Sequence, residues 1–176
     1  MSDNLSTRPA VNWYAVQTKP NAEIGLLQLI KAKKDDGKWP IDAYLPLKQT
    51  ADTPTPLFRG YLFVKHDDSG FHQLQYTTGV KCYVRFGGYP TPVPEKDISL
   101  IQLVETHFNQ AEFKESYLMA GQPVRIMGGV LNGRTGKLLE NASGKRVALE
   151  IENLGFSLAV RVPARHILPL PDTENV

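Results

Sequence analysis

The segment after Gly121 constrains the fold of this chain more than any other, because it reverses direction every few residues. Short runs of alternating apolar and polar side chains end at turns rich in glycine and asparagine. About five such runs follow one another in fewer than about sixty residues. A sheet that small hides its edges best by closing on itself. The pattern therefore predicts a small five-stranded β-barrel.

The part of the chain before this segment mixes strand-like and helix-like patterns. In the first helix, which Pro20 opens, Ile24, Leu27 and Ile30 fall at helical spacing, and Leu26 and Leu29 widen the expected apolar stripe. Strands are expected at residues 13–18, 43–47, 60–65 and 79–86. Helices are expected after Pro20, within residues 69–76 and after Pro94. This order favours an α+β domain in which helices flank an antiparallel sheet.

These patterns divide the chain into two modules. Residues 109–119 are polar and charged without a clear period, which is typical of a linker. The chain ends lack apolar runs and are expected to be tails. The predicted organisation is a tail at 1–11, an α+β domain at 12–108, a linker at 109–119, a barrel at 120–171 and a tail at 172–176.

Catalytic and metal-binding patterns are missing from the sequence. The four histidines lie at no ligand spacing from one another or from the single cysteine, Cys82. Cys82 has no activating neighbour in the sequence and is better explained as a strand residue than as a nucleophile. The glycine cluster at 128–136 lacks the Lys-Ser/Thr pair of a phosphate-binding loop. The sequence therefore predicts a protein that is not an enzyme and uses no metal and no cofactor.

The composition indicates a soluble intracellular protein. Hydrophobic residues make up 41% and charged residues 22% of the chain, which is ordinary for a globular protein. No window approaches the roughly 20 apolar residues of a membrane helix, and the polar N-terminus has no secretion signal. A lone thiol suits a reducing cytosol, so a cytoplasmic location is expected. The net charge of +2 is too small to indicate nucleic acid by itself.

The strongest strand pattern is the run Tyr61-Leu62-Phe63-Val64. Alternation places Tyr61 and Phe63 on one face and Leu62 and Val64 on the other, and both faces are apolar. Periodicity alone leaves two interpretations open. The strand is either buried on both sides or exposes one face as an aromatic docking patch.

A group of lysines is the best candidate for contact with nucleic acid. Lys19, Lys31, Lys33 and Lys34 outnumber the one acid of the segment, Glu23. Cations at the carboxyl end of a helix also suit its dipole and can simply be solvated. The sequence leaves both interpretations open.

The motifs, in this order, resemble the NusG family of transcription elongation factors and its specialised paralogues such as RfaH. The resemblance runs from Trp13 to Leu170. Its N-terminal part rests on Trp13-Tyr14, on the aromatic strand at 57–64, and on residues 78–87 and 94–98. The glycines and alternating apolar residues of 121–136 resemble the KOW motif. The resemblance implies a NusG-type N-terminal domain and a C-terminal SH3-like KOW barrel.

The resemblance also implies a function. In this family the N-terminal domain binds the clamp helices of the largest RNA polymerase subunit and suppresses pausing or termination. The polymerase-binding residues that it implies here are Tyr61, Phe63, Phe86, Ile98 and Ile101. The four lysines named above would face the non-template DNA strand. We therefore expect a monomeric transcription elongation or antitermination factor.

The KOW domain of the family recruits a further partner, either Rho or a small-subunit ribosomal protein. The partner-binding residues that the resemblance implies are Gly129, Val130 and Gly133. The aromatic residue that the family often has near Val130 is missing, and Arg59 stands where proline is usual. These departures favour a specialised paralogue over the housekeeping factor. The β period of residues 147–162 favours a β form of this domain over a helical one.

One alternative function remains open. KOW barrels also occur in ribosome- and RNA-binding proteins, so the second module alone fits that class as well. A protein of that class has no need of the N-terminal aromatic strand, which favours the polymerase-bound factor.

Overall fold

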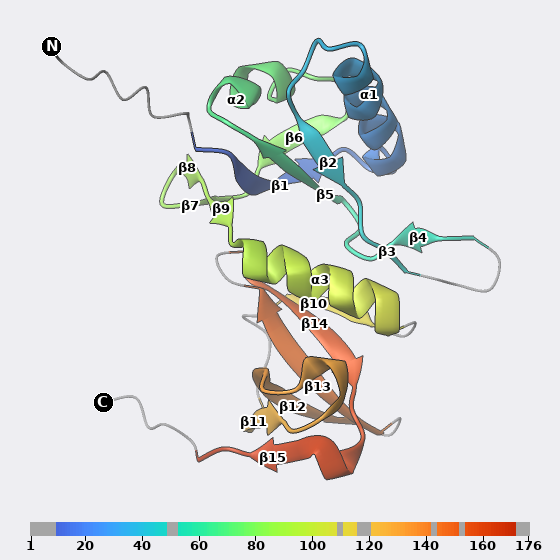
Figure 1. The fold of residues 1–176 in the computed structure, drawn as a ribbon, viewed down its shortest axis with the longest axis vertical. Helices are drawn as coiled ribbons and strands as arrows, with labels where there is room; N and C mark the ends of the chain where they lie inside the picture. Colours follow the sequence, from blue (N-terminus) through green and yellow to red (C-terminus); the bar gives the residue numbers. More distant parts are fainter. Residues whose placement is uncertain are drawn as a thin grey trace, which may run out of the picture. The chain divides into compact units, whose positions relative to one another are not determined.

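The structure of the chain, a computed structural model, describes residues 10–48, 53–108, 111–115, 121–141, 144–151 and 154–171 (Figure 1). These residues group into two compact units. The first unit contains the described residues up to Leu45 together with Arg59–Val93. The second contains the described residues of Pro46–Phe58 and those from Pro94 onward. The predicted tails at 1–9 and 172–176 lie outside the described residues, as do 109–110 and 116–119 of the predicted linker.

An antiparallel sheet forms the body of the first unit. Its strands are β1 (Asn12–Thr18), β2 (Asp42–Tyr44), β5 (Tyr61–His66), β6 (Val80–Tyr83) and β9 (Pro92–Val93). They lie in the order β2-β5-β1-β6, and β9 also pairs with β1 (Figure 1). The helices are α1 (Glu23–Asp35) and α2 (Ser69–Leu74), and a hairpin joins β7 (Arg85–Phe86) to β8 (Tyr89–Pro90). The sequence-based prediction of an antiparallel sheet with a few helices is confirmed.

The buried face of α1 matches the predicted apolar stripe only in part. Leu26 and Ile30 of that stripe are buried together with Glu23, whereas Ile24 is half exposed. The reason is a hydrogen bond at the start of the helix. The Gly60 N–H donates to Glu23 Oε1 at 2.7 Å, so the glutamate side of the first turn faces the sheet. A polar tether therefore sets the rotation of the helix, which hydrophobic periodicity alone could not predict.

A ring cluster built around His66 closes the other end of this sheet. His66 is fully buried, and its ring stacks on Tyr14 with centroids 5.0 Å apart. The Nδ1 atom lies 2.6 Å from the Asp67 carbonyl oxygen, which can only accept, so Nδ1 carries the proton. Nε2 then accepts from the Tyr83 hydroxyl at 2.9 Å. Burial lowers the pKa of His66 and raises the pKa of Tyr83, so both groups are neutral near pH 7.

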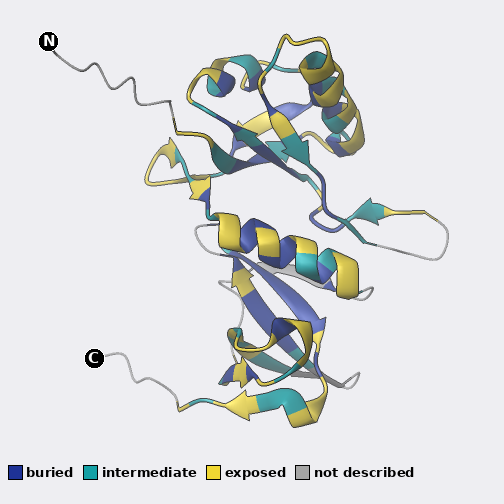
Figure 2. Cartoon of the chain, viewed as in Figure 1, coloured by how far each residue is buried: buried dark blue, intermediate teal, exposed yellow. Residues whose placement is uncertain are grey.

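The second unit contains a six-stranded antiparallel sheet. Its order is β10-β14-β13-β12-β11-β15. The strands are β10 (Glu112–Glu115), β11 (Pro123–Ile126), β12 (Thr135–Asn141), β13 (Gly144–Ile151), β14 (Phe156–Arg161) and β15 (Ile167–Pro169). The short 3-10 helices η2 (Gly129–Leu131) and η3 (Ala164–His166) lie in its connections. The five strand segments predicted after Gly121 thus form β11 to β15, and Figure 2 shows how deeply β14 is buried.

Two features of the second unit were not expected from the sequence. Strand β10 forms within the predicted linker, because residues 112–115 pair with β14. Helix α3 (Glu95–His107) also belongs to this unit, with the hairpin of β3 (Leu47–Lys48) and β4 (Thr55–Pro56). The Leu47 N–H donates to Glu105 Oε1 at 2.8 Å, which ties the hairpin to the helix. The Phe58 and Phe156 rings lie 6.3 Å apart and connect the same segment to β14.

Replacing Gly70 with alanine should destabilise the protein. An added Cβ would overlap the imidazole ring of His66, so the ring cluster would have to shift. Overpacking of this kind typically costs about 1–3 kcal/mol of the free energy of unfolding, which urea denaturation measures. Gly25→Ala is the matched control, because this helical glycine has open space around its Cβ position and should gain up to about 1 kcal/mol. Equal effects of the two substitutions would contradict the packing described here.

Stability should fall when the pH drops below about 6.5. The folded protein holds His66 neutral with a lowered pKa, whereas the unfolded chain takes up the proton near the ordinary value. Between about pH 6.5 and the folded-state pKa, the unfolded chain therefore binds one more proton than the folded protein. In that range the free energy of unfolding should fall by up to about 1.4 kcal/mol for each pH unit of acidification. Urea denaturation at several pH values between 8 and 5 measures this slope, because most carboxylates stay ionised in that range. A His66→Gln protein with an unchanged slope would show that another group is responsible.

Candidate interaction surfaces

Strand β5 places Tyr61 and Phe63 at the centre of the first sheet. Phe63 pairs with Ala15 on one side and with Tyr44 on the other, and the Phe63 and Tyr44 rings lie 6.3 Å apart. Phe63 has no exposed surface and Tyr61 is half buried. The sequence left open whether this strand is buried on both sides or exposes one aromatic face, and for Phe63 the structure shows burial. Its ring is a core residue in this structure and not part of an exposed patch.

Phe86 lies on the hairpin of β7 and β8, directly opposite Tyr89. Gly87 and Gly88 form the turn with positive φ values of 65° and 92°, which suits a tight hairpin. The Phe86 N–H donates to Thr91 Oγ1 at 2.8 Å and fixes the base of the hairpin. Directly opposite residues share a face, so Phe86 and Tyr89 present their rings together. They are 61% and 80% exposed, which makes this hairpin an open aromatic surface.

The other two polymerase-binding candidates, Ile98 and Ile101, lie on α3 and are buried. Because α3 groups with the second unit, the predicted set of five residues is divided between the two units. Of the five, only Phe86 is freely accessible.

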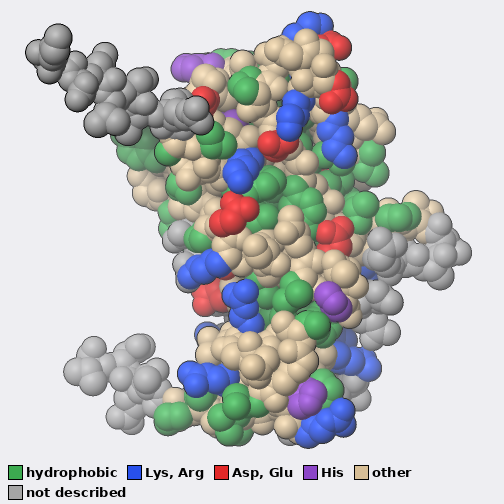
Figure 3. Space-filling model, viewed as in Figure 1, with side chains coloured by type: hydrophobic (Ala, Val, Ile, Leu, Met, Phe, Trp, Pro, Cys, Tyr) green, Lys and Arg blue, Asp and Glu red, His purple; other side chains and the backbone are tan. Residues whose placement is uncertain are grey.

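The four DNA-binding candidates are also divided. Lys19 is exposed in the loop before α1, whereas Lys31, Lys33 and Lys34 lie in its last turns. Thirteen helical residues span about 20 Å, so Lys19 cannot act as one cluster with the others. Lys34 forms an ion pair with Asp42. On the face drawn in Figure 3, basic and acidic side chains alternate over this part of the first unit.

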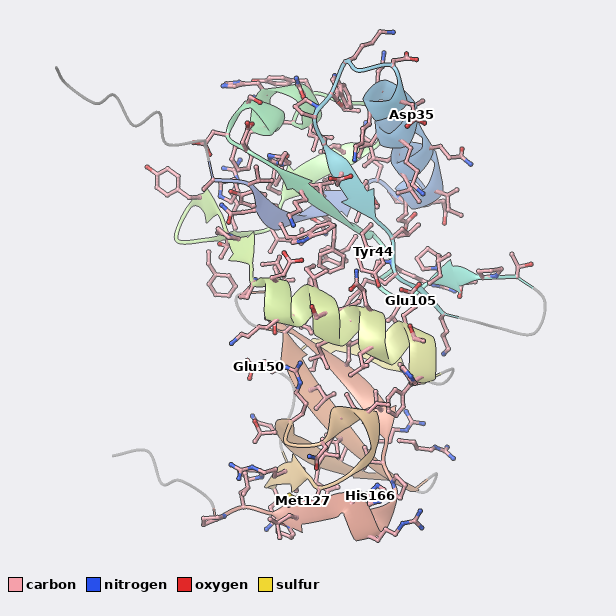
Figure 4. The ribbon with its side chains drawn as sticks, viewed as in Figure 1. Asp35, Tyr44, Glu105, Met127, Glu150 and His166 are labelled. Atoms are coloured by element: carbon pink, nitrogen blue, oxygen red, sulfur yellow. The ribbon has the colours of Figure 1, made fainter. Side chains whose placement is uncertain are left out.

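The glycine-rich connection between β11 and β12 carries the third predicted site. Gly129 and Gly133 adopt positive φ values of 67° and 83°, and the Gly133 N–H donates to the Ile126 carbonyl oxygen at 2.7 Å. Val130 is 47% exposed at the tip of this connection. Met127, which directly follows β11 in the same connection, is half exposed, and its N–H donates to the His166 carbonyl oxygen at 2.7 Å (Figure 4). This end of the sheet therefore offers a small apolar surface.

A cavity of about 560 Å³ lies within the second unit, beside the first turns of α3, and was not expected from the sequence. Its lining includes the cations Lys96, Arg134 and Lys137 and the acids Asp97 and Glu150. Figure 4 labels Glu150 on β13. Mixed charges of this kind favour no single ligand chemistry.

The described residues hold no group of three or more side chains suited to a metal ion. Among the helices that the structure describes, none is both long and apolar enough to cross a membrane. Cys82 is exposed on β6 and directs its thiol toward Gln17 Oε1 at 3.5 Å, which fits the expectation of a strand residue.

The described fold is that of a mixed α/β protein with antiparallel sheets and few helices. Residues 11–102 match the family model described as "NusG: Transcription termination factor nusG". Among solved structures, one on domain interaction in Thermotoga maritima NusG is similar at a TM-score of 0.63 with 20% identity, over 90% of this chain and 97% of that chain. The MjSpt4:Spt5 complex in conformation B is similar at a TM-score of 0.36 with 14% identity, over 93% and 99%. No curated protein shows a significant match.

The family model covers more than half of the chain, so the chain belongs to the NusG family. The proteins of this family are transcription factors and not enzymes. The prediction of a non-enzymatic transcription factor is therefore confirmed, as is the predicted membership of the NusG family. The likeness to the Thermotoga maritima structure supports the fold alone.

Truncating the two phenylalanines should affect folding very differently. Phe63→Ala removes a fully buried ring and should lower the free energy of unfolding by about 3–5 kcal/mol. Phe86→Ala removes an exposed ring and should change it by less than about 0.5 kcal/mol. Urea denaturation of both variants measures the difference. Comparable losses would show that the hairpin is packed against other parts of the chain.

Proposed function

We propose that this protein is a transcription elongation or antitermination factor that binds RNA polymerase through its NusG-type part. The single observation that carries the proposal is the match of residues 11–102 to the NusG family model. That range includes the whole of the first unit's sheet and the exposed hairpin of β7 and β8. The family description names termination, and suppression of pausing or termination is the finer activity proposed here.

The proposed docking surface on the polymerase clamp helices begins with Phe86. Its ring is open to solvent, and exposed aromatic side chains are frequent anchors of protein interfaces. Tyr61 is half buried, and the accessible part of its ring is proposed to contact the clamp helices as well. Phe63, Ile98 and Ile101 are buried, so they contribute directly only after a rearrangement that exposes them. Phe63 otherwise supports the surface from below by fixing β5 in the sheet.

The second unit is proposed to be an SH3-like KOW barrel that recruits a further protein. The turn with Gly129, Val130 and Gly133 is the proposed contact, extended by Met127. The side chains of Val130 and Met127 would form the apolar core of the interface, from which water is excluded. Rho and a small-subunit ribosomal protein are the candidate partners, and a specialised, RfaH-like role remains part of the proposal. The alternative function, binding to ribosomes or RNA, is supported only by the KOW-like pattern of the second unit and not by any feature of the first.

Substituting Phe86 tests the polymerase contact. Phe86→Ala should weaken binding to core RNA polymerase by about 2 kcal/mol, roughly thirtyfold, because an aromatic anchor is lost. The dissociation constant can be measured with labelled protein and core polymerase. Ile24→Ala is the matched control, because Ile24 is a half-exposed apolar residue of the same unit outside the proposed contact.

The control variant should bind as the wild type does. If both variants bind normally, Phe86 is no anchor. If the wild-type protein does not bind core polymerase but binds RNA or ribosomes, the alternative function is correct.

A further inference from the structure

Two segments of the second unit contain no acidic residue. There is no aspartate or glutamate between Glu115 and Glu140, and none between Glu152 and Asp172. The fold brings these two segments together, because β11 from the first pairs antiparallel with β15 from the second. The arginines and lysines of both segments therefore have no acid close to them in the sequence, and they give this part of the unit a local positive charge.

The same two segments carry the exposed apolar side chains of this unit. Met127, Val130 and Leu168 are each about half exposed. Among the residues of the second unit whose exposure the structure describes, these three are the exposed large hydrophobic ones, and none of them is aromatic. Singly exposed apolar residues need no explanation, but these three lie on two paired segments.

Backbone pairing places these apolar side chains beside two arginines. Arg125 lies directly opposite Leu168, so the two side chains share one face of the sheet. Met127 follows two residues later, and its N–H bond to the His166 carbonyl oxygen extends the pairing toward η3. Arg165 is exposed in η3. We call the five residues Arg125, Met127, Val130, Arg165 and Leu168 the β11–β15 surface.

The connection that follows Met127 is held in place. A Cβ added at Gly128 would lie 3.0 Å from the His166 ring, so the backbone and the ring are in close contact. The Asn132 N–H donates to the Gly129 carbonyl oxygen at 3.2 Å and closes the turn. Figure 4 shows Met127 and His166 at the same end of the second unit. A surface that is already ordered loses less entropy when a partner binds.

The two arginines are available to a partner. Arg125 and Arg165 are exposed, and neither forms an ion pair with a carboxylate that the structure describes. Among the described residues of β11 to β15, the acids are Glu140 and Glu150. Glu140 lies beyond the part of β12 that pairs with β11, and Glu150 on β13 lines the cavity beside α3. On the face drawn in Figure 3, the described side chains at the end of this unit remote from α3 are basic or hydrophobic but not acidic.

We propose that the β11–β15 surface binds an acidic segment of a partner protein. Apolar side chains of that segment cover Met127, Val130 and Leu168, and its carboxylates accept hydrogen bonds from the two arginines. This inference rests on the proposed function, since it names the chemistry of the partner that the second unit recruits. A guanidinium group donates two parallel N–H bonds to a carboxylate, which gives the contact a direction as well as attraction. A partner with a basic contact surface would be repelled.

The apolar centre of this surface favours a protein over a nucleic acid. Arginine fits phosphate as well as carboxylate, so the cations alone do not decide between the two. An unpaired strand gains affinity by stacking its bases on aromatic rings, and none of the five residues of the surface is aromatic. Methionine and arginine are instead frequent in protein interfaces, where methionine adapts its shape to the partner. RNA is the competing occupant that the experiment separates.

The test selects partners from a library of random 12-residue peptides displayed on phage, with the full-length protein immobilised. The retained peptides should combine acidic residues with large apolar ones, and their mean net charge should be more negative than that of the unselected library. One retained peptide is then synthesised with a fluorescent label and titrated with the protein in solution. Its affinity should fall as the salt concentration rises, because ion pairs at an exposed surface are screened.

Variants of the full-length protein locate the contact. Arg125→Gln with Arg165→Gln should weaken binding of the labelled peptide at least about tenfold, because two charge-assisted contacts are lost. Met127→Ser should weaken it severalfold, because the apolar centre is interrupted. Arg59→Gln is the matched control, since Arg59 is an exposed arginine of the first unit, and it should bind the peptide normally. Circular dichroism confirms that each variant keeps its fold.

The proposal is overturned if the selection retains no peptide, if the retained peptides are neutral or basic, or if the double arginine variant binds the acidic peptide normally. A labelled 12-nucleotide single-stranded RNA is titrated in parallel. If RNA binding depends on the two arginines and no acidic peptide is retained, the occupant is a nucleic acid and the proposal is wrong. Acidic peptides whose binding depends on the two arginines support it, whether or not RNA binds.

Affinity for core RNA polymerase separates this inference from the proposed function. It is measured for the wild-type protein and for the double arginine variant. If polymerase binds normally while no acidic peptide is retained, this inference fails and the proposed polymerase contact stands. If polymerase does not bind while acidic peptides are retained through the two arginines, the proposed polymerase contact fails and this inference stands.

Discussion

The antiparallel pairing of β1 with β5 is the constraint on which the rest of the first unit depends. Six residue pairs, from Asn12 with His66 to Gln17 with Tyr61, fix its register. A slip of one residue would move every side chain of β5 to the opposite face. The register places Phe63 in the core and His66 in the ring cluster. It also brings Gly60 within reach of Glu23, and that hydrogen bond sets the rotation of α1.

Because the centre of this sheet is closed, the accessible chemistry lies at its margins. The aromatic strand that dominates the sequence serves mainly as a scaffold, and the hairpin of β7 and β8 carries the open rings. The edge strand β6 carries the exposed Lys81. A rigid sheet with functional side chains on its connections is a common arrangement, since connections can vary without cost to the core. Contacts on these connections can thus differ while the core stays unchanged.

The sequence predicted the positions of the main strands and of the long helices because their periodicity is local. It did not predict β10, because residues 112–115 form a strand only by pairing with β14, more than forty residues away in sequence. It did not predict that Glu23 is buried in α1 or that Ile24 is half exposed. It left the environment of Phe63 open, since alternation cannot distinguish a strand buried on both faces from one that exposes a face. The exposure of Tyr76 and Tyr89 likewise depends on tertiary packing.

Hydrogen exchange of the full-length protein, with and without core RNA polymerase, tests the central claim most directly. The account predicts that polymerase slows exchange at backbone amides of the β7–β8 hairpin and of the adjoining turn at its base. These amides lie in an exposed connection, so a partner seated on the rings would protect them. The polymerase is added in large excess over the protein. If exchange then stays unchanged at every amide of residues 11–102, the account is contradicted.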